Sequence, residues 1–121
     1  MVKALFDTNI LIDHLNAVPQ ARDELDRYEG RSISVITWME VLVGAPPEVE
    51  EATRAFLGGF SVIGLDDEIA ARAVTFRRKH GIKPPDAIIW ATADVNSLLL
   101  VTRNTRDYGR DNPGVRVPYG L

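Results

Sequence analysis

The strongest constraint on the fold is the alternation of short aliphatic segments with amphipathic segments about a dozen residues long. The segments predicted to be strands are 2–6, 32–35, 60–65, 98–101 and 115–117. Helices are predicted directly after Asp7, at 19–29, from a cap at Thr37, at 47–57, from a cap at Asp66 or Asp67 to Gly81, and at 84–96. Strands separated by helices usually pair in parallel. The sequence therefore predicts an α/β fold with a mostly parallel central sheet flanked by helices.

Length and composition narrow the classes of protein further. The chain has 121 residues, of which 45% are hydrophobic and 26% charged, as expected for a single globular domain spanning 1–121. It has no Cys, which excludes disulfides, thiol catalysis and Cys-ligated metals, and its two His residues are far apart in the sequence. The aliphatic run 98–101 is too short for a membrane span, and Asp7 interrupts the apolar start. We expect a cytoplasmic protein without membrane association.

Charge is distributed unevenly along the chain. Residues 1–68 hold 5 Lys/Arg and 13 Asp/Glu, whereas residues 69–121 hold 9 and 4. Such a basic half is typical of a protein with a phosphate-rich partner, but a solvated helix face balanced elsewhere in the fold would give the same count. The basic residues that we take as candidates for binding a polyanion are Arg77, Arg78, Lys79 and Arg103.

Four acidic residues are predicted at the same edge of the sheet. Asp7 follows the first strand, Glu40 lies in a mostly apolar helix, Asp86 is in the first turn of its helix, and Asp107 follows the last long strand. Each has an ordinary explanation on its own, such as a helix cap for Asp7 or a turn for Asp107. Together they indicate a ligand site, because ligands of parallel α/β sheets bind at the carboxyl ends of the strands.

A cluster of carboxylates needs protons or a cation to offset its mutual repulsion. Oxygen ligands without Cys or paired His favour Mg²⁺, with Mn²⁺ as a possible substitute. Mg²⁺ at such a site can polarise a phosphodiester and activate the attacking water. The acidic residues thus predict metal-dependent phosphodiester hydrolysis, with the basic half holding the nucleic acid.

Four segments resemble the motifs of the PIN-domain ribonucleases, and specifically of VapC-type toxins. In order along the chain they are DTNILID at 7–13, ITWMEV at 36–41 with Gly44, PDAIIWATA at 85–93 and LVTRNTRDY at 100–108. The resemblance implies a PIN-like three-layer fold and a Mg²⁺-dependent endoribonuclease that acts as the toxin of a toxin–antitoxin pair. It also implies a homodimer, an RNA substrate and a cognate antitoxin that blocks the active site.

The resemblance also assigns roles to individual residues. Asp7, Glu40 and Asp86 match the three invariant acids of the family. Where many PIN domains have a fourth acid this chain has Asn104, so we assign the fourth catalytic and metal-binding role to Asp107 and a supporting role to Asn104. Thr8, Asn9 and Thr102 are expected to hold carboxylates or waters in place. The remaining acids of these regions, Asp13, Asp94 and Asp111, are interpreted as surface residues.

Three other functions stay open. Phosphotransferases with an aspartate nucleophile also begin with an Asp after the first strand, but they need a second Asp two residues later, where this chain has Asn9. A PIN nuclease in RNA processing without a toxin role would share the same motifs. A catalytically silent module that binds RNA or protein would typically have lost one of the first three acids.

Overall fold

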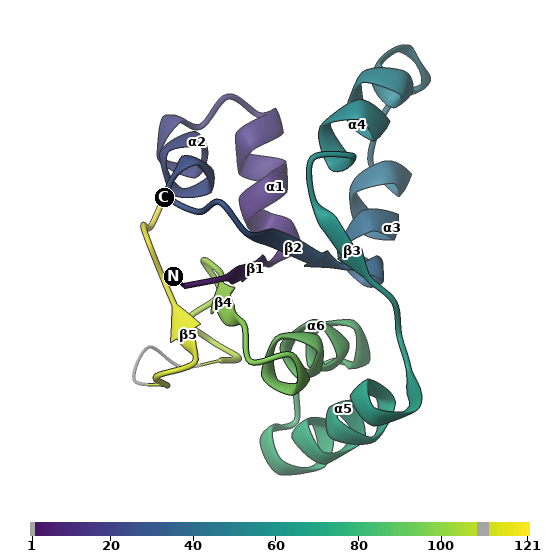
Figure 1. Ribbon diagram of the computed structural model, residues 1–121, viewed down its shortest axis with the longest axis vertical. Coiled ribbons are helices and arrows are strands. Elements are labelled where there is room, and N and C mark those ends of the chain that lie inside the picture. The colour runs from purple at the N-terminus through teal and green to yellow at the C-terminus, as the bar shows by residue number, and fades with distance from the viewer. Residues whose placement is uncertain (1, 109–111) are drawn as a thin grey trace.

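The computed structural model describes residues 2–108 and 112–121, and it forms three layers with a parallel sheet in the middle (Figure 1). The sheet order is β3-β2-β1-β4-β5, and all four pairings are parallel. Its strands are β1 (Ala4–Phe6), β2 (Arg31–Ser34), β3 (Ser61–Ile63), β4 (Leu99–Val101) and β5 (Val115–Arg116). The predicted α/β class and parallel sheet are confirmed. None of the helices in the described residues is long and apolar enough to cross a membrane.

The helices divide between the two faces of the sheet (Figure 1). One face carries α1 (Thr8–Leu15), α2 (Pro19–Asp26), α3 (Val35–Val43), the short 3₁₀ helix η1 (Pro47–Val49) and α4 (Glu50–Leu57). The other face carries α5 (Asp67–His80) and α6 (Pro84–Val95). Helices on both faces are what a parallel sheet requires, because it is apolar on both sides.

The period of two along the strands gives each face its own core. Leu5 and Leu100 point toward α5 and α6, where they pack with Ile69, Ile89 and Trp90. Their neighbours Ala4, Phe6 and Val101 point to the opposite face and pack with residues of α1, α2 and α4. Because β1 is completely buried, it fixes Asp7 at the carboxyl end of the central strand.

Local signals located most helix ends correctly. The Asp66 side chain caps α5 by accepting from the Ile69 N–H at 2.8 Å, and Gly81 ends this helix with a φ of +69°, which glycine adopts without strain. Pro84 opens α6 as predicted.

Three expectations about helix ends were wrong. The cap of α3 is Ser34, whose hydroxyl accepts from the Ile36 N–H at 3.1 Å, so Thr37 lies inside the helix and is buried. The helix expected at 47–57 is a 3₁₀ turn followed by α4, and α2 ends at Asp26 rather than at residue 29. The Ser34 cap starts α3 directly at the end of β2, which brings Glu40 close to the end of β1.

Candidate active site

Asp7 is the most buried of the four acids, and its carboxylate accepts three hydrogen bonds. It follows β1 and caps α1, its Oδ1 accepting from the Thr8 N–H at 2.7 Å. Its Oδ2 accepts from the Thr102 hydroxyl at 2.8 Å and from Asn9 Nδ2 at 3.3 Å. Only 4% of the residue is exposed. Burial raises the pKa of Asp7 to about 6, although the hydrogen bonds from Thr102 and Thr8 oppose the shift.

The four acids are linked through the charges of their carboxylates. Asp86 and Glu40 both raise the pKa of Asp7. The pKa of Asp86 is itself raised, first by partial burial and then by the charges of Asp107 and Glu40. Asp7, Glu40 and Asp86 are thus close enough for their charges to act on one another, and Asp107 is close enough to act on Asp86. Two of them sit on helices of opposite layers, Glu40 on α3 and Asp86 in the first turn of α6.

The polar residues predicted to support the acids lie beside them. The Thr8 hydroxyl donates to Glu40 Oε1 at 2.6 Å and is 3.0 Å from the hydroxyl of Thr37. Asn104 Nδ2 donates to Asp107 Oδ2 at 2.9 Å, while its Oδ1 accepts from the backbone N–H groups of Arg106 and Asp107. Asn104 therefore shapes the loop after β4 and contacts the Asp107 carboxylate.

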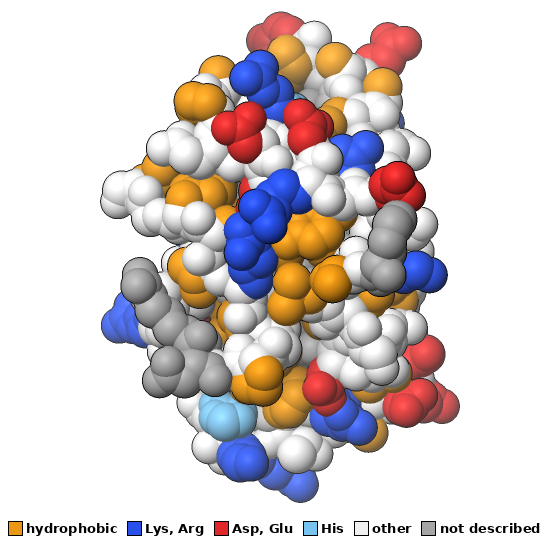
Figure 2. Space-filling view, turned by 60° about the vertical axis from the view of Figure 1, so that its left-hand side comes forward, with side chains coloured by type: hydrophobic (Ala, Val, Ile, Leu, Met, Phe, Trp, Pro, Cys, Tyr) orange, Lys and Arg blue, Asp and Glu red, His pale blue; other side chains and the backbone are white. Residues whose placement is uncertain are grey.

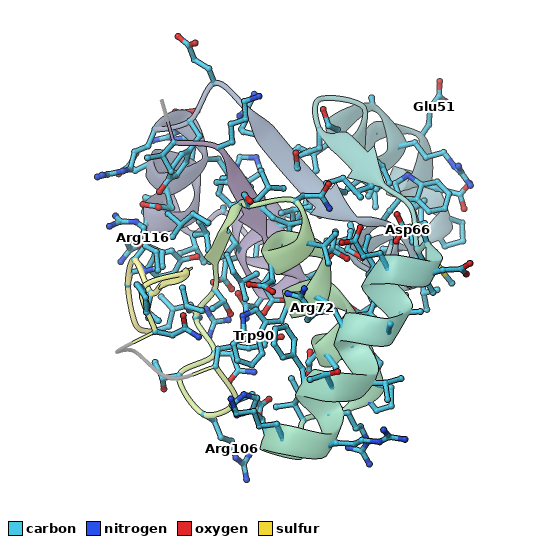
Figure 3. All side chains as sticks on the ribbon, turned by 60° about the horizontal axis from the view of Figure 1, so that its bottom comes forward. Glu51, Asp66, Arg72, Trp90, Arg106 and Arg116 are labelled. Atoms are coloured by element: carbon cyan, nitrogen blue, oxygen red, sulfur yellow. The ribbon has the colours of Figure 1, made fainter. Side chains whose placement is uncertain are left out.

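Tyr108 is part of the site, although the sequence analysis gives it no role. Its hydroxyl donates to the backbone carbonyl of Asp86 at 3.1 Å, and its ring packs edge-on against Trp90, with 5.5 Å between the ring centroids. Trp90 lies in the interior of the molecule (Figure 3). Burial and then the four carboxylates raise the pKa of Tyr108, so it stays a neutral donor. An aromatic residue directly after Asp107 was the signal available in the sequence.

The donor chemistry of this region fits a hard divalent cation. Among residues 2–108 and 112–121, no three His, Asp or Glu side chains form a ready-made metal cluster. Mg²⁺ does not require one, because it keeps several waters and binds directly through one or two carboxylates. Burial, and then the charges of Asp86 and Glu40, raise the pKa of Asp7, so a cation beside it would stabilise a carboxylate that is otherwise favoured in its protonated form.

Asp13 was wrongly interpreted as a surface acid, and the structure changes the role of Arg103. Asp13 is only 4% exposed, and Arg103 binds it in a bidentate ion pair, with Nε to Oδ2 at 2.5 Å and Nη2 to Oδ1 at 3.0 Å. The guanidinium of Arg103 is therefore engaged inside the protein, and we remove this residue from the candidates for RNA binding. Asp94 is exposed as expected and pairs with Arg72, and Asp111 lies outside the described residues.

The other basic candidates lie at the end of α5 and are exposed. Arg77 donates to the carbonyl of Ile82 at 2.7 Å, so it closes the end of this helix. Arg77 and Arg78 line an apolar hollow together with Pro84 and Ala87, two residues of the first turn of α6, which also contains Asp86. Lys79 is exposed in the same turn, and Arg106 extends outward from the loop after β4 (Figure 3).

The excess of basic residues in the second half of the chain is partly neutralised inside the fold. Arg103 and Arg116 pair with Asp13 and Glu24, both from the acidic first half. Figure 2 shows a face on which Lys and Arg side chains alternate with Asp and Glu. For Arg103 and Arg116, the basic charge is therefore balanced by acids elsewhere in the fold. Arg77, Arg78 and Lys79 at the end of α5 remain an exposed basic cluster in the described part of the chain.

Comparisons with known proteins agree on one family. The model of the PIN domain matches residues 4–110. The chain is 32% identical to the tRNA(fMet)-specific endonuclease VapC of Shigella flexneri, over 91% of this chain and 92% of that protein. It is 37% identical to ribonuclease VapC10 of Mycobacterium tuberculosis, over 83% and 81%. A chain in a toxin–antitoxin complex from Klebsiella pneumoniae is 45% identical with a TM-score of 0.93, and the match covers 98% of this chain and 100% of that one.

Proposed function

The chain belongs to the PIN-domain family and resembles its VapC-type toxins, and we propose from this that it is a Mg²⁺-dependent endoribonuclease. It hydrolyses RNA phosphodiester bonds at the site formed by Asp7, Glu40, Asp86 and Asp107. The observation that carries this proposal is the buried carboxylate of Asp7, which three hydrogen bonds hold at the end of β1, with Asp86 and Glu40 close enough for their charges to act on it. Buried carboxylates placed beside other acids are typical of functional sites, because the arrangement costs stability.

Each residue has a distinct part in the proposed reaction. Asp7, Glu40, Asp86 and Asp107 would hold the cation, directly or through its waters. When bound, Mg²⁺ polarises the phosphate and lowers the pKa of the attacking water. Thr102, Asn9 and the Thr8 N–H fix the Asp7 carboxylate, while the Thr8 hydroxyl fixes Glu40. Glu40 is exposed, so it can accept a proton from water at the mouth of the site.

RNA approaches this site along the end of α5 in our proposal. Arg78 and Lys79 are exposed there, and the turn that follows leads directly to Asp86. Lys83 lies close enough to Asp86 for its charge to lower the pKa of that acid. Cations beside the acidic cluster can hold the phosphates that flank the scissile bond. Because two relatives are named tRNA(fMet)-specific endonucleases, initiator tRNA is the first substrate to test.

A nuclease active in its own cell needs an inhibitor, and we propose a cognate antitoxin that inserts an Arg or Lys into the acidic site. The likeness to a chain of a toxin–antitoxin complex supports the partner. A guanidinium pairs well with clustered carboxylates and competes with the metal. The apolar side chains of Met39 and Val43, 51% and 87% exposed on α3, offer a surface next to Glu40 for such a peptide.

The homodimer implied by the resemblance is also a proposal. Leu65 and Val74 are about half exposed and line the apolar hollow beside α5, as an interface between copies would require. Light scattering after gel filtration tests it, because the chain mass of 13.4 kDa would be doubled.

The direct experiment for the activity uses purified protein without antitoxin and initiator tRNA or total RNA. We expect cleavage in Mg²⁺, no cleavage in EDTA, and recovery when Mg²⁺ is added back in excess. Cleavage that continues at the same rate in EDTA would contradict the proposed role of the metal.

A further inference from the structure

Two buried acids in this protein are held in the same way. Arg103 binds Asp13 through two hydrogen bonds, and the Tyr119 hydroxyl donates to Asp13 Oδ2 at 2.8 Å. Glu24 is held by a similar set, since Arg116 binds it at 2.7 and 3.0 Å and the Tyr28 hydroxyl donates to it at 2.9 Å. Arg27 adds a longer ion pair to Glu24, with 3.7 Å between Nε and Oε1. Both acids are 4% exposed. We call the first set the Asp13 triad (Asp13, Arg103, Tyr119) and the second the Glu24 triad (Glu24, Arg116, Tyr28).

The Asp13 triad continues directly into the active site. The backbone N–H of Arg103 donates to Asn9 Oδ1 at 3.1 Å, which fixes the orientation of the Asn9 amide. The other end of that amide, Nδ2, donates to Asp7 Oδ2 at 3.3 Å and to the Thr102 hydroxyl at 3.2 Å. The connection thus runs from the Asp13 carboxylate to the guanidinium of Arg103, along that side chain to the backbone N–H, and through the Asn9 amide to the Asp7 carboxylate.

The Glu24 triad differs at this point. Arg116 belongs to β5, and its carbonyl accepts from the Thr102 N–H at 3.0 Å in the regular ladder between β4 and β5. The sheet therefore holds the backbone of Arg116 whatever its side chain does. Arg103 lies beyond the end of β4, in a loop without such a ladder. The direction of its N–H consequently depends on where its side chain is anchored.

Tyr119 brings the C-terminal end of the chain into this arrangement. Residues 117–121 have no regular secondary structure, and the C-terminus lies beside α2 (Figure 1). The Tyr119 hydroxyl is the contact that joins this tail to the carboxylate of Asp13 on α1. A tail that stops short of Tyr119 would leave Asp13 with Arg103 alone.

We infer that Asp13, Arg103 and Tyr119 are positioning residues of the nuclease site, which hold the Asn9 amide and the start of the β4 loop against Asp7. The inference rests on the proposed function, because the carboxylate that is positioned is a proposed metal ligand. Polar groups that orient a ligand typically change metal affinity about 10-fold to 100-fold when they are altered. The C-terminal tail is then part of the active-site architecture.

The test compares matched substitutions in the two triads. Arg103→Lys and Arg116→Lys each keep a positive charge beside the buried acid and lose the two-pronged contact, so neither leaves a carboxylate without a cation. Tyr119→Phe and Tyr28→Phe each remove one hydroxyl. For the full chain, the side-chain amide signals of Asn9 are recorded by NMR without metal, and Mn²⁺ affinity is then measured well below the unfolding temperature of every variant.

We expect Arg103→Lys to shift the Asn9 signals and to weaken Mn²⁺ binding about 10-fold, with a smaller change in the same direction for Tyr119→Phe. Arg116→Lys and Tyr28→Phe should lower stability to a similar degree, leave the Asn9 signals in place and keep the Mn²⁺ affinity of the unmodified protein.

Unchanged Asn9 signals in both Arg103→Lys and Tyr119→Phe would overturn the inference, and so would equal effects in the two triads. Failure of the unmodified protein to bind Mn²⁺ would contradict the proposed function instead. The Asn9 signals would still decide the positioning role, because they are recorded without metal.

Discussion

The hydroxyl of Thr8 donates a 2.6 Å hydrogen bond to Oε1 of Glu40 and so connects the start of α1 with the middle of α3. Thr8 uses its backbone N–H at the same time to bind Asp7. One residue therefore fixes two of the four acids relative to each other. A polar side chain at position 8 can therefore orient Glu40 relative to Asp7, which the geometry of β1, α1 and α3 alone does not do.

Replacement of Thr8 should therefore reduce cleavage more than stability. Thr8→Val keeps the shape and the N–H but loses the hydroxyl, and we expect cleavage to fall about 10-fold because Glu40 is no longer oriented. Thr8→Ser restores the hydroxyl and should recover most of the rate. Steady-state cleavage and urea unfolding of both variants measure this. Equal cleavage rates for Thr8→Val and Thr8→Ser would argue against a role of the hydrogen bond between Thr8 and Glu40.

The stability of the metal-free protein should depend on pH through Asp7. Burial raises the pKa of this carboxyl from 3.8 to about 6 in the folded state. A group with a raised folded pKa contributes stability below its unfolded pKa and loses it as pH rises through its folded pKa. Between about pH 4 and pH 7 the unmodified protein should therefore lose up to about 3 kcal/mol of unfolding free energy relative to Asp7→Asn.

Urea unfolding in EDTA at several pH values measures that difference. Titrating groups that do not interact with Asp7, such as Glu24 with its lowered pKa, contribute equally to both proteins and cancel. A difference between the two proteins that stays constant across this pH range would show that Asp7 titrates normally.

RNA affinity should decrease steeply with salt concentration and should depend on the end of α5. Arg78→Ala and Lys79→Ala should each weaken binding and flatten the log–log slope by somewhat less than one unit, because each removes one phosphate contact. Arg22→Ala, an exposed arginine on α2 in the opposite layer, is the control and should leave the slope unchanged. Fluorescence anisotropy in EDTA, where no cleavage is expected, gives the affinities. Identical slopes for all four proteins would rule out this path for the RNA.

Expression of the chain alone should arrest bacterial growth, and co-expression of the protein encoded directly upstream should relieve the arrest. Cells that express the Asp86→Asn variant without that partner should grow normally, because the substitution disrupts the acidic site. Growth curves with matched protein levels test both statements. Normal growth with soluble, active nuclease would count against the toxin role and would leave the nuclease activity standing.

Local patterns in the sequence were sufficient for the elements of the fold and for the place of the acids. Asp66, Gly81 and Pro84 determine the ends of their helices through contacts within a few residues, so the local sequence is enough to predict these ends. The cap of α3 could not be assigned in this way. Ser34 and Thr37 are both good cap residues, and the choice depends on where β2 stops, which its pairing with β1 and β3 decides.

The contacts of Asp13 were beyond the sequence because they join distant segments. Asp13 and Arg103 are 90 positions apart, and Tyr119 is 106 positions from Asp13. Nothing near Asp13 distinguishes a buried carboxylate from an exposed one at the end of a helix. The arginine that neutralises it looked like a phosphate ligand because charge counts along the chain do not show which charges meet in the fold.

The most direct test of the whole account is a comparison of Asp7→Asn with Asp23→Asn in a single-turnover RNA cleavage assay with Mg²⁺. Both substitutions remove one negative charge with almost no change of shape, but Asp7 is buried at the acidic site and Asp23 is exposed on α2. We predict that Asp7→Asn remains folded and cleaves at least about 100-fold more slowly, while Asp23→Asn cleaves like the unmodified protein. Cleavage by folded Asp7→Asn at the rate of Asp23→Asn would contradict the account.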